Sequence, residues 1–444
     1  MASPTSPHPR EQLTAKAVTV WLGAVLVYVA AILGRTSFGV AGVAAIDRFG
    51  VDASRIAVFT AVQVGVYALA QIPVGVLIDR YGPRLLLVAG ALIMAVGQIT
   101  LGLTDSYAVA IVARILIGAG DSTAFLSALR VLPYWFPLKH TPLFTQLTAS
   151  LGQLGQFLSA MPFLWLLHAQ GWTTAFVSLG ALGALIGIVA GIAVADSPEA
   201  SGLSKEARRE RKAELKAQRT PLGEILKTVL RSPLCWEAFC IHGFSMFFML
   251  NFTLLWGIPL ATLGMGLSPS QGGMILTVYT VATMLSAPFL GPLSARAGKN
   301  RDLAALTIAA IHCAVWVWFF ASPEPRGYAF ILALMVLMGF ATPTSNYGFD
   351  TVREDMPRTM VATGTGLGNM GGFVAAMISS QVVGLLLDHS APGGDYGWGD
   401  FRFAWIAVFA IWAALVIGLF VSRHFVLRGR RGHSGGSVRI VSES

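Results

Sequence analysis

Charge is scarce in this 444-residue chain, because Asp, Glu, Lys and Arg together make up only 12% of it. Soluble domains carry roughly 25% charged residues, and the mean hydropathy of +0.67 also indicates a lipid environment. The net charge of +9 comes from short loops, one central segment and the C-terminal tail, not from one helix face. We therefore expect a protein of the lipid bilayer that does not bind nucleic acid.

Other features are also missing. Three cysteines, Cys235, Cys240 and Cys313, stand among apolar residues and are too few for a disulfide framework or a metal site. They are expected to be buried free thiols. The N-terminal residues show no removable signal peptide, and no phosphate-binding Gly-x-x-x-x-Gly-Lys-Ser/Thr loop occurs. We predict no cofactor, no metal and no enzymatic activity.

Long apolar stretches dominate the chain. A helix needs about 20 apolar residues to cross a bilayer. Twelve stretches are long enough, at 17–46, 55–78, 85–104, 107–132, 143–168, 172–194, 233–264, 269–293, 303–321, 328–350, 360–386 and 400–422. The predicted fold class is an all-α polytopic membrane protein with twelve transmembrane helices in two six-helix bundles.

The connections define the organisation of the chain. It is predicted to comprise an N-terminal segment (1–16), a first bundle (17–194), a linker (195–232), a second bundle (233–422) and a tail (423–444). Lysine and arginine gather in the linker, the tail and the loops on the side of both termini. The positive-inside rule then makes the termini and the linker cytoplasmic. We expect a monomer in a prokaryotic plasma membrane.

The two halves repeat at an offset of 216 residues. Gly75, Leu77, Arg80 and Gly82 match Gly291, Leu293, Arg296 and Gly298, and Gly152, Gly155 and Phe157 match Gly368, Gly371 and Phe373. Such repeats place a substrate site between the halves, near the middle of the membrane.

Two segments carry a family resemblance. Gly75-Val-Leu-Ile-Asp79-Arg80-Tyr-Gly82-Pro-Arg84 resembles the helix 2–3 signature of the major facilitator superfamily, and Arg114-Ile-Leu-Ile-Gly118-Ala-Gly120 resembles its helix 4 signature. The resemblance implies a transporter in which Asp79, Arg80 and Arg84 latch a cytoplasmic gate, with Arg130 in contact with Asp79 or reaching the interface. The second copy has Ala295 in place of the aspartate, so a latch there stays open to question. Asp350, with Arg353, Glu354 and Asp355, is also expected at this gate.

Helix 4 is similar, more specifically, to the anion:cation symporter branch, through Arg114 to Ser122 and Leu129 to Pro137. Members carry an arginine in helix 1 and an acid in helix 4, and they move organic anions with protons. The resemblance assigns these places to Arg35 and Asp121. Galactonate transporters have an aspartate just before the arginine, where this chain has Gly34, so one proton-handling carboxylate is missing.

Few ionisable residues stand inside the apolar stretches. A central Arg or Asp costs roughly 2.5–3.5 kcal/mol on insertion scales, so such residues are expected to be paired inside the bundle. Polar residues concentrate in helices 1, 4, 7 and 10, which predicts a wet cavity between them. At 1.5 Å per residue, Arg35 and Asp121 lie at similar depth, and Arg114 shares a face with Asp121. Asp121 thus has two candidate partners.

The pair predicts a coupling mechanism. An anion bound to Arg35 weakens its hold on Asp121 and favours a proton there, so each ligand helps the other to bind. The alternatives are that Asp121 is only a structural counter-ion and that Arg114 either ties helix ends or relays protons. Asn251 is the repeat partner of Arg35, which indicates a substrate with one carboxylate and one neutral end. Further candidate substrate contacts are Gln63, Gln153, Gln156, Tyr279, Asn346 and Asn369; His242 and His312 are interpreted as core residues.

The predicted function is import of a small organic anion, a carboxylate or sugar acid, by proton symport through alternating access. Drug or metabolite efflux by proton antiport and nitrate/nitrite transport remain alternatives within transport. A transporter-like sensor is the non-transport alternative.

Overall fold

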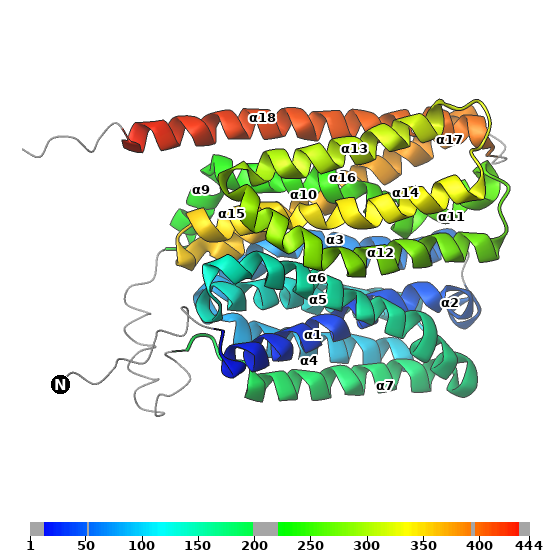
Figure 1. Ribbon diagram of the computed structural model, residues 1–444. Coiled ribbons are helices and arrows are strands. Elements are labelled where there is room, and N and C mark those ends of the chain that lie inside the picture. The colour runs from blue at the N-terminus through cyan, green and yellow to red at the C-terminus, as the bar shows by residue number, and fades with distance from the viewer. Residues whose placement is uncertain (1–12, 51–52, 199–220, 392–395, 435–444) are drawn as a thin grey trace, which may run out of the picture.

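The computed structural model describes residues 13–50, 53–198, 221–391 and 396–434, in which helices run nearly parallel to one long axis (Figure 1). The basic residues at 205–219 and the ends of the chain lie outside these ranges. We call the end of the bundle where α1 begins and α18 finishes the terminal end (Figure 1).

The first bundle follows the chain in order. It contains α1 (Ala15–Val40), the short α2 (Gly42–Phe49), α3 (Ala53–Tyr81), α4 (Pro83–Leu103), α5 (Tyr107–Trp135), η1 (Leu138–His140), α6 (Thr141–Leu158), η2 (Ser159–Phe163) and α7 (Leu164–Ala193). Gly171 has φ 78° and ψ 176°, so α7 is two helices joined at this glycine. Residues 141–170 and 172–193 are therefore separate crossings.

The second bundle repeats the pattern. A short α9 (Leu222–Arg231) leads into α10 (Pro233–Asn251), which continues through η4 (Phe252–Trp256), α11 (Gly257–Pro259) and η5 (Leu260–Gly264). Then come α12 (Pro269–Ala297), η6 (Gly298–Asn300), α13 (Arg301–Ala321), α14 (Tyr328–Ala341), η7 (Thr342–Asn346), α15 (Tyr347–Asp355), η8 (Arg358–Met360), α16 (Val361–Ser390), α17 (Trp398–Ala404) and α18 (Ile406–Ser434). The last helix thus extends beyond the predicted end at residue 422.

The described residues contain twelve crossings, as predicted. Length and apolarity alone give ten candidate spans, because Pro288–Ala321 joins the end of α12 to α13 and another span runs for 56 residues from Leu138 to Ala193. At 1.5 Å per residue that is far longer than the roughly 30 Å hydrocarbon core, so it holds two crossings. Large apolar side chains such as Ile192, Leu385 and Ile417 are exposed on the outer surface, where lipid would cover them.

Local sequence fixes the helix starts. Proline occupies the first turn of α4, α10 and α12, where its missing N–H costs nothing. Ser268 and Gln271 form a capping box at α12. Gly82 joins α3 to α4 with φ 87°, and the carboxylate of Asp196 lies 2.5 Å from where a Cβ would stand. Only glycine fits this turn.

The two bundles touch along two pairs of helices, α3 with α16 and α6 with α12. The repeated glycines make the closest approaches. A Cβ on Gly75 would lie 2.7 Å from the carbonyl oxygen of Ala362, and a Cβ on Gly291 would lie 2.6 Å from Cα of Leu143. The internal repeat is therefore visible as two equivalent backbone contacts between the bundles.

Candidate functional site

A central cavity of about 580 Å³ lies between the bundles. Both halves contribute to its wall, through Tyr28, Arg35, Tyr67, Phe125, Ala149, Ser150 and Gln153 on one side and His242, Met246, Met249, Tyr279, Thr283, Thr342, Pro343, Ser345, Asn346, Asn369 and Phe373 on the other. The lining comes from α1, α3, α5 and α6 and from their counterparts in the second half, as the repeat predicts.

Arg35 of α1 and Asp121 of α5 form an ion pair at this cavity. Arg35 Nε lies 2.6 Å from Asp121 Oδ2, and Nη2 lies 2.9 Å from Oδ1. The Arg35 side chain is 23% exposed and the Asp121 side chain only 1%. The Tyr67 ring centroid lies 4.6 Å from Cζ of the guanidinium. The arginine thus faces the cavity, and the carboxylate lies behind it.

Gly34, the residue before Arg35, lies against α4. The carbonyl of Gly34 accepts a hydrogen bond of 2.9 Å from Gln98 Nε2. A Cβ at Gly34 would lie 2.8 Å from Met94 Cε and 2.9 Å from that same amide nitrogen. Both atoms are the ends of flexible side chains of α4, so an aspartate here would require Met94 and Gln98 to move, and in this chain the amide of Gln98 occupies the space.

Arg114 forms no ion pair with Asp121 in the described residues, although its charge acts on Asp121 from a distance, which corrects one of the two pairings expected. Its side chain is 1% exposed, with Nε 3.4 Å from the carbonyl of Phe59 and Cζ 4.5 Å from the Phe38 ring centroid. Its Nη1 has no hydrogen-bond partner among the described residues. Arginine side chains lean toward the N-terminus of their helix, and this direction takes Arg114 away from Asp121.

The other predicted contacts divide into two groups. Gln153, Tyr279, Asn346 and Asn369 line the cavity together with Arg35. Gln63, Gln156 and Asn251 do not. Gln63 lies buried beside Asp121, behind the wall.

Asn251 is the clearest correction. Its Oδ1 accepts hydrogen bonds from Ser379 at 3.3 Å and Ser380 at 2.8 Å, so the side chain joins α10 to α16. The π-helical turn η4 begins at the next residue, Phe252. The repeat identifies the equivalent position on the helix, but two serines on the neighbouring helix give the amide a better partner than the cavity does.

His242 lines the cavity, although the sequence favoured a core role for it. It is 2% exposed, and its Nδ1 lies 3.4 Å from the carbonyl oxygen of Ser345. Its Nε2 has no hydrogen-bond partner among the described residues, and its ring centroid lies 4.8 Å from that of Phe349, with the two rings tilted by 32°. The signal for it was its place in the seventh crossing, one of the four predicted to surround the cavity.

Comparison with known proteins decides the family. The model for the Major Facilitator Superfamily matches residues 24–380. The chain belongs to this superfamily. It is accordingly a membrane transporter and not an enzyme.

Several transporters are similar to this superfamily member over part of their length. A probable sulfoacetate transporter of Cupriavidus necator is 29% identical over 157 residues, which are 35% of this chain and 36% of the relative. A probable L-galactonate transporter of Escherichia coli is 27% identical over 35% of this chain and 34% of its own length. A probable galactarate/D-glucarate transporter of Escherichia coli is 26% identical over 28% of this chain and 29% of its own length. The matches thus span about a third of these relatives.

One solved structure agrees in fold. The proton:xylose symporter XylE, bound to 6-bromo-6-deoxy-D-glucose, superposes with a TM-score of 0.65 at 15% identity. The superposition covers 90% of this chain and 95% of XylE. Both bundles therefore have the major facilitator arrangement.

The helix 2–3 signature of the superfamily forms a contact between the bundles. Asp79, at the end of α3, accepts a hydrogen bond from Arg130 Nε at 3.0 Å. It also accepts from the backbone N–H groups of Ala362 and Thr363 at 3.1 and 2.8 Å and from Thr363 Oγ1 at 2.8 Å. These two residues open α16, where a helix N-terminus favours a negative charge. Asp79 therefore joins three helices from both bundles.

The other two signature arginines lie beside this contact. Arg80 is exposed, with Cζ 5.9 Å from the Tyr81 ring centroid. Arg84 donates its backbone N–H to Asp196 Oδ1 at 3.0 Å. The hydrogen bonds that cross between the bundles here run through Asp79, with Arg130 as its partner inside the first bundle.

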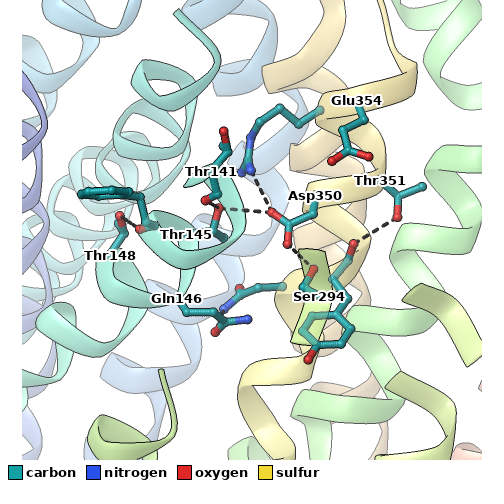
Figure 2. A network of polar contacts seen from close by, with 12 residues as sticks. Thr141, Thr145, Gln146, Thr148, Ser294, Asp350, Thr351 and Glu354 are labelled. Atoms are coloured by element: carbon teal, nitrogen blue, oxygen red, sulfur yellow. Dashed lines mark hydrogen bonds and ion pairs between the residues drawn. The ribbon is translucent and has the colours of Figure 1, made fainter. Parts of the chain in front are cut away.

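A second contact between the bundles exists despite Ala295 (Figure 2). Asp350 of α15 accepts hydrogen bonds from Ser294 Oγ of α12 at 2.7 Å, Thr145 Oγ1 of α6 at 3.2 Å and Arg353 Nη1 at 2.8 Å. Thr145 belongs to the first bundle, so this acid, too, joins the halves. The acid of this contact stands in the tenth crossing, whereas the repeat partner of Asp79 would stand in the eighth.

Charged residues extend this second contact. Arg301 donates from Nη1 and Nη2 to the carboxylate of Glu354 at 2.6 and 2.8 Å, and from Nε to the carbonyl of Ser294 at 3.0 Å. Arg423 on α18 pairs with Asp302. Asp350, Arg353 and Glu354 thus lie together where the sequence placed them, with Arg301 as an additional member.

Between each acid and the cavity lies a pair of amides. Asn346 donates to Gln146 Oε1 at 3.1 Å, and Gln146 donates to the carbonyl of Pro343 at 2.9 Å. On the other side Asn369 donates to Gln71 Oε1 at 2.7 Å. These hydrogen bonds between the two bundles all lie from the cavity toward the terminal end. The cavity is closed on that side.

Proposed function

We propose that this transporter imports a small organic anion together with a proton by alternating access. The observation that carries the proposal is the Arg35–Asp121 pair, in which one guanidinium is shared between the cavity and a buried acid. Arginine has five N–H donors. Two of them bond Asp121, so a ligand carboxylate can use others.

The pair supplies coupling between the two ligands. Removing one partner of a buried ion pair leaves an uncompensated charge, which costs several kcal/mol. An anion that draws Arg35 toward the cavity creates this situation at Asp121. A proton on the carboxylate removes the charge, so the anion and the proton stabilise each other's binding.

The opposite wall suits the neutral end of the substrate. Tyr279, Thr342, Ser345 and Asn346 present hydroxyl and amide groups to the cavity, and the Thr342 hydroxyl has no hydrogen-bond partner among the described residues. Hydroxyl groups of a sugar acid could bond to these donors and acceptors. This fits with a relative named for L-galactonate, which has one carboxylate and a hydroxylated end. These residues take the place that the sequence gave to Asn251.

The terminal end is proposed to be cytoplasmic in a prokaryotic plasma membrane. The basic residues of its loops support this orientation. Asp79 and Asp350 then form two cytoplasmic latches, and the closed side of the cavity corresponds to an outward-facing or occluded state. The protein is proposed to work as a monomer, since both bundles of one chain complete the cavity.

The test is uptake by purified protein in liposomes with an inside-alkaline pH gradient. Labelled L-galactonate, sulfoacetate, galactarate and nitrate serve as probes. Arg35→Ala should reduce uptake of the transported anion at least 100-fold, because the cavity loses its one arginine. Arg326→Ala is the matched control, since this arginine lies at the opposite end against the Trp318 ring and should transport normally. Normal uptake by Arg35→Ala, or uptake of nitrate alone, would contradict the proposal.

A further inference from the structure

The cavity carries very little charge. Arg35 is its one cationic side chain, and no aspartate, glutamate or lysine appears among its lining residues in the described part of the chain. Tyr28, Tyr67, Tyr279 and His242 are its other titratable groups. A second cation, which a second carboxylate or a sulfonate would need, is absent from this wall.

The surroundings of Asp121 contain one acid and two arginines. Arg35 and Tyr28 face it from α1, Tyr67 from α3, and Arg114 from its own helix. Arg114 does not line the cavity and forms no ion pair within the described residues, so its charge stays the same when the cavity is loaded. Asp121 is therefore the single acid at this site whose protonation can change when an anion binds.

His242 is the other group that could take up a proton. It lies in the cavity wall, with Nδ1 near the carbonyl of Ser345 and its ring against Phe349. No carboxylate lies within ion-pair distance of it in the described residues. A histidine cation would stand unpaired in an apolar setting, which is unfavourable, so His242 stays neutral.

Counting charges gives the stoichiometry. In the empty state the charges of Arg35 and Asp121 cancel each other, and the charge of Arg114 is the same in the empty and the loaded state. A bound carboxylate adds one negative charge, and a proton on Asp121 removes one. The loaded and the empty cavity then carry the same charge, which avoids the cost of moving an extra charge through the bilayer.

We propose that the substrate is a monovalent organic anion carried with one proton, so that each transport cycle moves no net charge. The proposal rests on the proposed function of Arg35 and Asp121. A dianion with one proton would change the charge of this site by one unit between the empty and the loaded state and should be a poor substrate. Sulfoacetate, named for one relative, carries two charges and is therefore expected to be a poor substrate, whereas L-galactonate carries one.

The experiment measures steady-state accumulation in liposomes that contain the full-length protein. A fixed inside-alkaline pH gradient is combined with valinomycin and either equal potassium or a tenfold potassium gradient that makes the interior negative. One uncompensated charge per cycle changes the accumulation ratio about tenfold under this gradient. The probes are L-galactonate as the monoanion and sulfoacetate and galactarate as dianions.

We expect the pH gradient to drive L-galactonate accumulation and the potassium gradient to change it less than twofold, with both dianions at least tenfold lower. A tenfold rise of L-galactonate accumulation on making the interior negative shows a second proton and overturns the proposal. Dianion accumulation that equals or exceeds that of L-galactonate also overturns it. No gradient-driven uptake of any of the three probes contradicts the proposed function itself.

A variant gives an independent check. Asp121→Asn keeps the side-chain shape and removes the proton site, so the anion crosses alone. Its accumulation should no longer respond to the pH gradient and should fall about tenfold when the interior is made negative. If the variant stays insensitive to the potassium gradient, Asp121 is not the compensating group, and the proposal is wrong.

Discussion

At the scale of single residues, exposure separates the roles within the ion pair. Arg35 reaches the cavity and Asp121 does not. Arg35 can therefore bind a substrate directly, whereas the protonation of Asp121 depends on the substrate only through its ion pair with Arg35. The sequence indicated this pair from the depth of two charges in two apolar helices. It could not indicate that Arg114 would lie apart, because side-chain direction depends on Phe59 and Phe38, which come from other helices.

His242 provides a prediction at this scale. Replacing it with Phe removes the unpartnered Nε2 and should raise the KM for the transported anion roughly tenfold, since one hydrogen bond to a buried group is worth about 1–3 kcal/mol. Dependence on the pH gradient should stay, because Asp121 is intact. Transport kinetics in liposomes measure both quantities.

His312 offers the matched control for this substitution. It is equally buried but accepts a hydrogen bond from Trp316 Nε1 at 2.8 Å, away from the cavity. His312→Phe should therefore lower the Tm and leave KM unchanged. An unchanged KM in His242→Phe would remove this histidine from the substrate site.

At the scale of helices, the two interfaces between bundles are built alike from different residues. Each interface has a glycine in close contact with the other bundle, a pair of amides and a buried acid. The acid is Asp79 at the α3–α16 interface and Asp350 at the α6–α12 interface. The 216-residue repeat predicted the glycines. The second acid, Asp350, was expected at this gate from its neighbours Arg353, Glu354 and Asp355 and not from the repeat, because it stands in the tenth crossing, whereas the repeat partner of Asp79 is Ala295 in the eighth.

The second latch can be weakened by one hydroxyl. Thr145→Val removes the hydrogen bond to Asp350 that crosses between the bundles (Figure 2), and it should open the terminal end more often. The reporter is a cysteine at Ala149 in the cavity, in a chain with its three native cysteines replaced by serine. Its maleimide labelling from the terminal side should become roughly threefold to tenfold faster, the range expected for about 1 kcal/mol.

Thr351→Val is the control for this measurement. The Thr351 hydroxyl bonds the carbonyl of Tyr347 on its own helix, so labelling should match the parent. Equal labelling rates in Thr145→Val and Thr351→Val would show that the Asp350 contact does not hold the bundles together.

The close glycines give a second prediction for helices. Gly291→Ala places a methyl group 2.6 Å from Cα of Leu143, and the bundles must separate to accept it. Transport should fall at least tenfold while the protein still folds and reaches the membrane. Gly273→Ala lies on the same helix with no atom within 4 Å of the new Cβ and should transport normally; similar losses in both variants would contradict the role of the contact.

At the scale of the whole molecule, the apolar pattern was enough to predict twelve crossings and two bundles. The length of each apolar stretch follows from the thickness of the bilayer. The number and length of these stretches can be read from the sequence alone. The cavity wall was less accessible to prediction. Asn346 and Asn369 line it and Asn251 does not, because an amide inside a membrane bonds whichever partner the neighbouring helices provide.

Alternating access depends on the direction in which the cavity can open. With both latches closed, the cavity can open only toward the end opposite the terminal end. Binding of an anion and a proton must then favour release of the contacts at Asp79 and Asp350. The account therefore requires that substrate and proton enter together.

The most direct measurement is proton uptake on addition of substrate to liposomes without any imposed gradient. Adding L-galactonate in excess outside should make the weakly buffered medium more alkaline, with about one proton taken up per anion, and Asp121→Asn should abolish the pH change while retaining exchange of labelled L-galactonate. Uptake of the anion by the parent protein with no change in external pH would contradict proton-coupled transport through the Arg35–Asp121 pair.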